Sequence, residues 1–177
     1  IIYTPSQDWN GEDTFTYKAN DGTDDSNTAT VTVTVTSVND APVTEDQSAS
    51  TDEDTAVDIT LTSSDVESDT ITYSIVSDVS NGTTALSGTT VTYTPTANWN
   101  GTETFTFKAN DGTTDSNTST VTITVAAVND APVVENLSMT VVQNNSKELN
   151  LNANDVDSST FTFTINSNPS NGTTSLS

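Results

Sequence analysis

Short runs in which apolar residues alternate with threonine recur along this chain. The stretches TATVTVTVTSV (28–38), TTVTYTP (89–95) and TFTFKA (104–109) follow this pattern. A period of two places the apolar side chains on one face of a β-strand, and β-branched threonine suits the wet face. No segment carries a sustained apolar period of 3.6 residues. The pattern predicts a folded, all-β protein, although the high net charge and the 31% hydrophobic fraction would favour disorder.

The chain also repeats itself at a fixed distance. TVTSVNDAPV (34–43) returns as TVAAVNDAPV (124–133), ninety residues further on. At this shift, residues 1–40 match 91–130 at 27 of 40 positions, and 41–87 match 131–177 at 20 of 47. The spacing predicts a tandem array. It places one complete β-sandwich repeat at residues 41–130, the C-terminal half of a preceding repeat at 1–40, and the N-terminal half of the following repeat at 131–177.

Turn residues divide the complete repeat into seven short segments. The strands are expected at 47–51, 56–61, 70–77, 83–87, 89–95, 102–110 and 118–127, separated by Gly-, Asn- and Asp-rich stretches such as SNG and NDGTTDS. Seven alternating strands in about 90 residues predict seven-stranded β-sandwiches of the cadherin/immunoglobulin-like type. An up-and-down β-barrel built from the same strands is the less favoured alternative.

Neither terminal half can close a sandwich of its own, because each would leave an apolar face and unpaired strand edges. One interpretation is that the sequence is an excerpt of a longer array, since its start, IIYTP, is typical of the middle of a domain. The other interpretation is that residues 131–177 of one chain complete residues 1–40 of the next.

The composition excludes several classes of function. The chain has no Cys, His or Arg, and three Lys against 25 acidic residues give a formal charge of −22. Disulfides, thiolate metal sites and a Cys nucleophile are therefore excluded, and the commonest general base is missing. Phosphate neutralisation is not possible, so nucleic acid is not a partner. No run approaches the ~20 apolar residues of a membrane span and no signal peptide is present, so we expect no direct membrane insertion.

The carboxylates gather in loops, at the ends of the predicted sandwich where consecutive repeats would meet. Examples are TDED (51–54) and DVESD (65–69). Clustered oxygen ligands without His or Cys describe a site for a hard cation, and Ca²⁺ accepts irregular carboxylate and carbonyl ligands more readily than Mg²⁺. The alternatives are polar turns without an ion, or adaptation to a salty medium, which would spread carboxylates over strand faces as well.

Three motifs in order carry a family resemblance. VNDAP resembles the interdomain linker of cadherins, SDVESDTITYSI (64–75) resembles their Asp-x-Asp segment, and FKANDGT (107–113) resembles their Ala-x-Asp-Gly segment. The stretch 98–133 more closely resembles the bacterial cadherin-like tandem repeats of giant surface adhesins, which are immunoglobulin-like sandwiches. This resemblance covers the whole chain. It implies an extracellular location at the bacterial cell surface and calcium at the domain junctions.

The resemblance also implies which residues would bind calcium. The first junction would use Asp13, Asn39, Asp40, Asp65, Glu67 and Asp111. The second would use Asn129, Asp130, Asp155 and Asp157, with Glu53 or Asp54 and Glu103. Both linkers lack the leading Asp and the second Asn of the cadherin linker, so one or two ions per junction are expected in place of three. An alternative role for the Asn-Asp pairs is to form turns that the following Pro directs.

These features predict a protein that is not an enzyme. Glycosidase chemistry needs two carboxyl groups facing each other across a cleft, whereas these acids crowd on loops and recur in each repeat. Trp9 and Trp99 precede Asn-Gly turns, where a Trp is expected to close the end of a core. We predict a stalk segment of a large bacterial adhesin, rigidified by calcium, whose partners are neighbouring repeats of the same or like chains. A cell-surface or glycan target would be bound by domains outside this segment.

Two other functions remain open at this point. The first is a subunit of an extracellular filament in which terminal half-domains of neighbouring chains complement each other. The second is a glycan-binding module, which would need an exposed aromatic patch that the sequence does not reveal.

Overall fold

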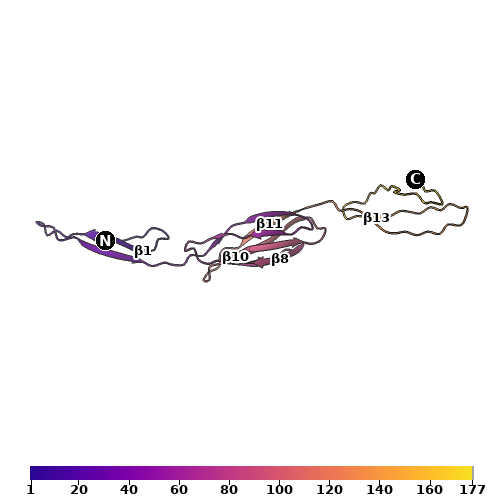
Figure 1. Cartoon of the computed structure of the whole chain (residues 1–177). Helices are drawn as coiled ribbons and strands as arrows, with labels where there is room; N and C mark the ends of the chain where they lie inside the picture. The colour runs from indigo at the N-terminus through magenta and orange to yellow at the C-terminus, as the bar shows by residue number, and fades with distance from the viewer. Residues whose placement is uncertain (177) are drawn as a thin grey trace.

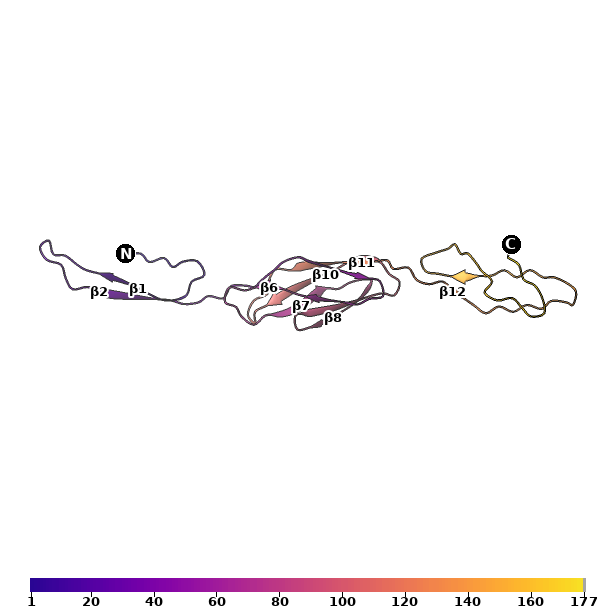
Figure 2. The same cartoon turned by 45° about the horizontal axis from the view of Figure 1, so that its top comes forward.

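The computed structural model, described here for residues 1–176, is an extended string of three segments with the termini at opposite ends (Figures 1 and 2). We call residues 1–40 the first half, residues 41–130 the central sandwich and residues 131–176 the last half. Thirteen strands and no helix occur in the described residues, and none of them forms a helix that could cross a membrane.

Nine strands belong to the central sandwich. They are β3 (Val43–Thr44), β4 (Gln47–Asp52), β5 (Val57–Thr60), β6 (Ser63–Ser64), β7 (Thr72–Ser77), β8 (Gly82–Ser87), β9 (Thr90–Pro95), β10 (Gly101–Asn110) and β11 (Ser119–Ala126). One sheet has the order β4-β11-β10-β7 and the other β5-β9-β8. All pairs are antiparallel except β4 and β11, which run parallel.

All seven predicted strands are present, with ends within two residues of the expected positions. The sequence did not predict the β3–β6 pair, because two residues are too few to show an alternation. The all-β sandwich predicted from the period-two pattern is confirmed.

The core lies between the two sheets and consists of the alternate residues of their strands. Phe105 and Phe107 of β10 are fully buried beside Val121 and Ile123 of β11. Tyr93 of β9 is also buried, and its hydroxyl donates a hydrogen bond to the Asn81 carbonyl at 2.7 Å. The intervening residues of β10 and β11 are mostly threonine and lie on the outer face. Trp99 packs against this core, in the role predicted for it.

The outer segments are open versions of the same unit. The first half contains a hairpin of β1 (Gly11–Tyr17) and β2 (Ala29–Val35), and the last half contains the short pair β12 (Val133–Val134) and β13 (Ala153–Asn154). Tyr17 is 54% exposed, whereas its counterpart Phe107 is 0% exposed. Similar sequences therefore differ in burial because no second sheet covers either outer segment here.

Replacing Phe107 by Ala should lower the free energy of unfolding of the central sandwich by about 3–5 kcal/mol, because a large buried side chain leaves a cavity. Thr104→Ala, on the outer face of the same strand, is the matched control and should change it by less than about 0.5 kcal/mol. Urea denaturation followed by Trp99 fluorescence in a Trp9→Phe background measures both. Equal losses in the two variants would contradict the assigned faces.

Candidate metal centres at the domain junctions

The first linker (residues 36–42) is tied to two loops of the central sandwich. The Asn39 side-chain amide donates to Asp111 Oδ2 at 2.8 Å, and the Asp40 backbone N–H donates to Glu67 Oε2 at 3.1 Å. Pro42 at the end of the linker is buried. Four of the residues predicted for this junction, Asn39, Asp40, Glu67 and Asp111, are therefore in direct contact in pairs.

The loop between β6 and β7 presents three carboxylates to one another. Ligand oxygens of Asp65, Glu67 and Asp69 all lie within 4.8 Å of each other. Asp65 Oδ1 accepts the Asp69 N–H at 3.0 Å, while Asp65 Oδ2 is buried without a hydrogen-bond partner. Asp69 was not among the predicted ligands, although its position in the run Asp-x-Glu-x-Asp was an available signal. Such close negative charges attract a cation.

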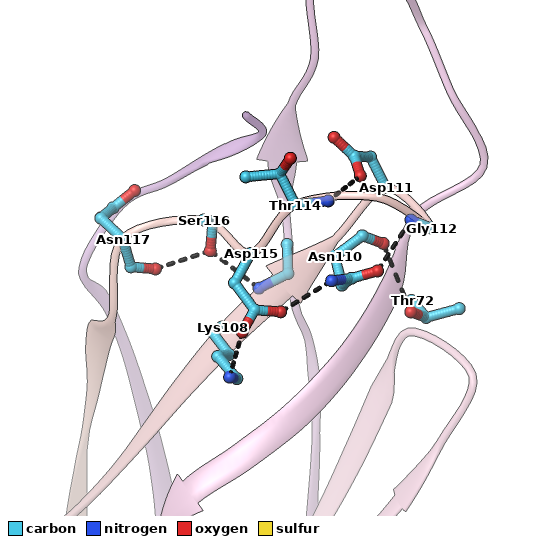
Figure 3. Close-up of polar contacts among 10 residues, drawn as sticks. Thr72, Lys108, Asn110, Asp111, Gly112, Thr114, Asp115, Ser116 and Asn117 are labelled. Carbon is cyan, nitrogen blue, oxygen red and sulfur yellow. Dashed lines mark hydrogen bonds and ion pairs between the residues drawn. The ribbon is translucent and has the colours of Figure 1, made fainter. Parts of the chain in front are cut away.

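The loop between β10 and β11 supplies backbone N–H donors to the Asp111 carboxylate (Figure 3). Asp111 Oδ1 accepts the backbone N–H groups of Thr113 and Thr114, both at 2.6 Å. The Thr114 bond, followed by the Asn39 side-chain bond, holds the pKa of Asp111 below its ordinary value. Asp115 closes the same loop by accepting from Asn110 and pairing with Lys108. The loop is thus a fixed platform for the linker.

The second linker (residues 127–132) approaches the last half in the same way as the first approaches the central sandwich. The Asp130 N–H donates to Asp157 Oδ2 at 2.6 Å, as Asp40 does to Glu67. Asp155 Oδ1 accepts the N–H groups of Asp157 and Ser158. Asp130 Oδ2 is buried without a hydrogen-bond partner, as Asp65 Oδ2 is at the first junction, although Asp130 corresponds in the repeat to Asp40.

Glu53, in the turn after β4 of the central sandwich, holds the start of the second linker. It is only 4% exposed, and its Oε1 accepts the Val128 N–H at 2.6 Å. Its own N–H donates to the Ala126 carbonyl at 2.8 Å. The neighbouring Asp54 accepts the Asn98 N–H at 2.9 Å, which ties the β4–β5 turn to the loop before β10. The buried position of Glu53 and its contact with the linker could not be read from the sequence.

Negative charge from both sides of the second linker acts on Asp130. Its pKa is raised above the ordinary value, first by desolvation and then by the carboxylates of Asp157, Asp54, Glu53 and Asp155. Two of these residues belong to the central sandwich and two to the last half. The negative charge that acts on Asp130 therefore comes from both sides of the junction.

Two predicted ligands have other contacts. Asp13 accepts hydrogen bonds from the Tyr3 hydroxyl and the Thr14 N–H within the first half. Glu103 Oε2 accepts the backbone N–H groups of Ser80 and Asn81 in the β7–β8 loop. Neither makes a hydrogen bond to a linker, and their role as calcium ligands stays a prediction. Asn129 donates only to the carbonyl of its neighbour Asp130.

Comparison with known families gives this architecture a name. The sequence profile of a family described as "Bacterial Ig domain" matches residues 1–34 and 39–124. This chain belongs to the bacterial Ig domain family. The membership agrees with the cadherin-like resemblance of its motifs, because both describe immunoglobulin-like sandwich repeats. Bacterial Ig domains commonly occur as repeats in surface or extracellular proteins, and they are structural units.

Solved structures similar to this bacterial Ig chain include two endo-fucoidan hydrolases of glycoside hydrolase family 107. MfFcnA4 is 20% identical, with a TM-score of 0.44, over 74% of this chain and 22% of the enzyme chain. MfFcnA9 is 22% identical, with a TM-score of 0.36, over 69% and 23%. The chain thus spans less than a quarter of either enzyme, and scores this low support no argument about activity. A search of curated proteins gave no match.

The repeat offers a matched pair of variants for the linker contact. Asp21 holds its own loop through the N–H groups of Thr23 and Asp24, as Asp111 does, but only Asp111 also accepts from Asn39. Asp111→Ala should therefore speed amide hydrogen exchange at Asp40 and lower the melting temperature of the central sandwich. Asp21→Ala should change neither. Unchanged exchange in Asp111→Ala would show that the loop does not hold the linker.

Asp130 and Asp111 should affect the pH dependence of stability with opposite signs. The pKa of Asp130 is raised in the folded state, so this group adds stability at a pH below its pKa in the unfolded chain. That stability is lost as the pH rises through its pKa in the folded chain. The pKa of Asp111 is lowered in the folded state, so this group adds stability at a pH above its pKa in the unfolded chain. That stability is lost as the pH falls through its pKa in the folded chain. Carboxyl carbon NMR titration in chelator should give midpoints above 3.8 for Asp130 and below 3.8 for Asp111.

The variant Asp157→Asn separates the two causes of the raised pKa of Asp130, which are desolvation and neighbouring charge. It removes the largest charge effect but keeps an oxygen that can accept the Asp130 N–H. The Asp130 midpoint should fall in this variant without reaching 3.8, since desolvation remains. A midpoint at or below 3.8 in the unmodified chain would contradict the proposed charge crowding.

Proposed function

We propose that this segment is a calcium-stiffened spacer in a bacterial surface or extracellular protein. The observation that carries the proposal is the pair of buried carboxylate oxygens, Asp65 Oδ2 and Asp130 Oδ2, that have no hydrogen-bond donor. A carboxylate oxygen that is shielded from water and has no donor costs free energy. A cation from solution would supply that charge at both junctions.

The chain has no spare cation of its own for this purpose. Lys18 pairs with Asp25, Lys108 pairs with Asp115, and Lys147 donates to the Thr140 carbonyl. Since these are the three basic side chains of the sequence, the linker carboxylates depend on the solvent for compensation. This favours a bound metal ion over an internal ion pair.

The donor set fits calcium. It consists of oxygens only, and it comes from loops and turns, as Ca²⁺ sites commonly do. We assign the first site to Asp65, Glu67 and Asp69 with the linker residue Asp40. We assign the second to Asp130, Asp155 and Asp157, with Glu53 and Asp54 contributing charge from the opposite side. When bound, calcium would supply positive charge, and the protein residues would hold the linker.

The mechanical consequence follows from where these residues lie. Repelling carboxylates on both sides of the second linker favour hinge angles that separate them. Neutralising the charges removes that preference, and contacts to both sides make bending costly. A string of such repeats would project a distal binding domain away from the cell. The outer faces of β10 and β11 in the central sandwich carry mainly threonine and few carboxylates. This argues against acidity as a general adaptation of the surface to salt.

Calcium should raise the melting temperature of the full chain and stiffen it, as followed by thermal denaturation and small-angle scattering after chelator treatment. A ligand at 100 times its Kd adds about 2.7 kcal/mol to stability. Asp130→Asn should lose the response of the second junction only. Glu12→Gln removes the same charge from an exposed site on β1 and should respond as the unmodified chain does.

Two results would overturn this function. One is a chain whose melting and shape ignore millimolar calcium. The other is an equal response to sodium at matched ionic strength, which would assign the effect to screening.

A further inference from the structure

The central sandwich holds the chain that enters it from residue 39 onward. The Asn39 side-chain amide donates to Asp111 Oδ2, and the Asp40 N–H donates to Glu67 Oε2. Both acceptors lie in loops of the sandwich itself, between β10 and β11 and between β6 and β7. Among the described residues, 36–38 make no hydrogen bond to the central sandwich. The hold on the entering chain therefore begins at residue 39.

Thr44 makes the second set of contacts between the entering chain and the sandwich. Its N–H donates to Asn117 Oδ1 at 3.0 Å, and its hydroxyl donates to the Asn117 carbonyl at 3.0 Å. The Asn117 side chain donates back to the Thr44 carbonyl at 2.9 Å. Thr44 is buried, and Asn117 lies in the same loop as Asp111. One loop therefore holds the entering chain on both sides of Pro42.

The central sandwich also holds the chain that leaves it, as far as residue 128. The last pair of the parallel β4–β11 ladder is Asp52 with Ala126. Glu53 extends this ladder, because its N–H donates to the Ala126 carbonyl and its Oε1 accepts the Val128 N–H at 2.6 Å. Among the described residues, 129–132 make no hydrogen bond to the central sandwich. The hold on the leaving chain therefore ends at residue 128.

These two limits are neighbours in the repeat. Both are taken from the central sandwich, the one complete repeat, whose two linkers lie at opposite ends (Figures 1 and 2). The ninety-residue shift makes residue 128 correspond to residue 38 and residue 129 to residue 39. One repeat thus holds the linker up to the residue directly before the one at which the next repeat begins to hold it.

We propose that successive repeats are joined with no free linker residue, and that Glu53 is the positioning residue that sets the upstream limit. Bending is then confined to the backbone dihedral angles between Val128 and Asn129, since the peptide bond itself is rigid. At the second junction the downstream contact is that of Asp130 with Asp157, the counterpart of Asp40 with Glu67.

The sequence favours a hydrogen-bonding role for Glu53 over one that needs its charge. Gln143 stands at the corresponding position of the following repeat. Glutamine has the length of glutamate and a side-chain oxygen that accepts an N–H, but it is uncharged. An acceptor of this length is therefore the property that the two positions share.

These contacts need no ion, so the proposal goes beyond the proposed function and is tested on the full chain in chelator. Amide hydrogen exchange is followed residue by residue by NMR. Glu53→Ala should speed exchange at Val128 by about tenfold or more, because it removes a hydrogen bond to a charged acceptor. Glu53→Gln should keep the protection of Val128. Exchange at Asp40, at the other end of the sandwich, should be unchanged in both variants.

A second experiment lengthens the joint directly. A glycine inserted between Val128 and Asn129 adds a free residue and leaves the contacts on both sides intact. Spin labels on Thr102→Cys and Ser159→Cys report the distance across the joint by electron paramagnetic resonance, since the natural chain has no cysteine. The insertion should broaden the distribution of distances in chelator. A glycine inserted after Gly88, in the turn between β8 and β9, is the control and should leave it unchanged.

Three results would overturn the proposal. The first is exchange at Val128 that Glu53→Ala leaves unchanged, and the second is exchange in Glu53→Gln as fast as in Glu53→Ala. The third is a distribution of distances that the inserted glycine does not broaden. Thermal denaturation followed by Trp99 fluorescence checks that the sandwich stays folded, and the insertion decides if Glu53→Ala unfolds it. None of these results bears on the calcium response of the unmodified chain, so the two proposals fail separately.

Discussion

The closure of one sheet over the other is the contact on which the rest of this molecule depends. Phe105 and Phe107 become fully buried only because β5, β8 and β9 cover the sheet that carries them. Where that cover is missing, a nearly identical hairpin leaves Tyr17 more than half exposed. The alternating residues of the repeat therefore form a closed core only where both sheets are present.

A closed sandwich also determines where negative charge can collect. The strands are occupied by core residues on one face and largely by threonine on the other, so most carboxylates are left to the turns at both ends. Those turns are rigid because their side chains bind backbone N–H groups, as Asp111 does with Thr113 and Thr114. Charges that repel one another are thereby held next to a linker and cannot move apart without breaking hydrogen bonds.

The sequence predicted the features that a local pattern can encode. Alternation located all seven main strands, and the Asn-Asp motif located both linkers. It could not show that β4 runs parallel to β11, because that pairing joins residues about 75 positions apart. For the same reason it did not show that Glu53 is buried against Val128. The resemblance grouped Asp13 and Glu103 with the linkers, and it could not show their hydrogen bonds to Tyr3 and to the Ser80 N–H.

The two junctions share a linker motif but differ in the loop that faces the linker. At the first, the carboxylates of Asp65, Glu67 and Asp69 come from one loop, in which Glu67 accepts the Asp40 N–H. At the second, Ser159 replaces the third acid, while Asp157 still accepts the Asp130 N–H. The backbone contact that holds the linker against the next repeat is therefore kept while the number of acids beside it changes. Because those acids lie in turns, they can be exchanged without altering the sandwich that presents them.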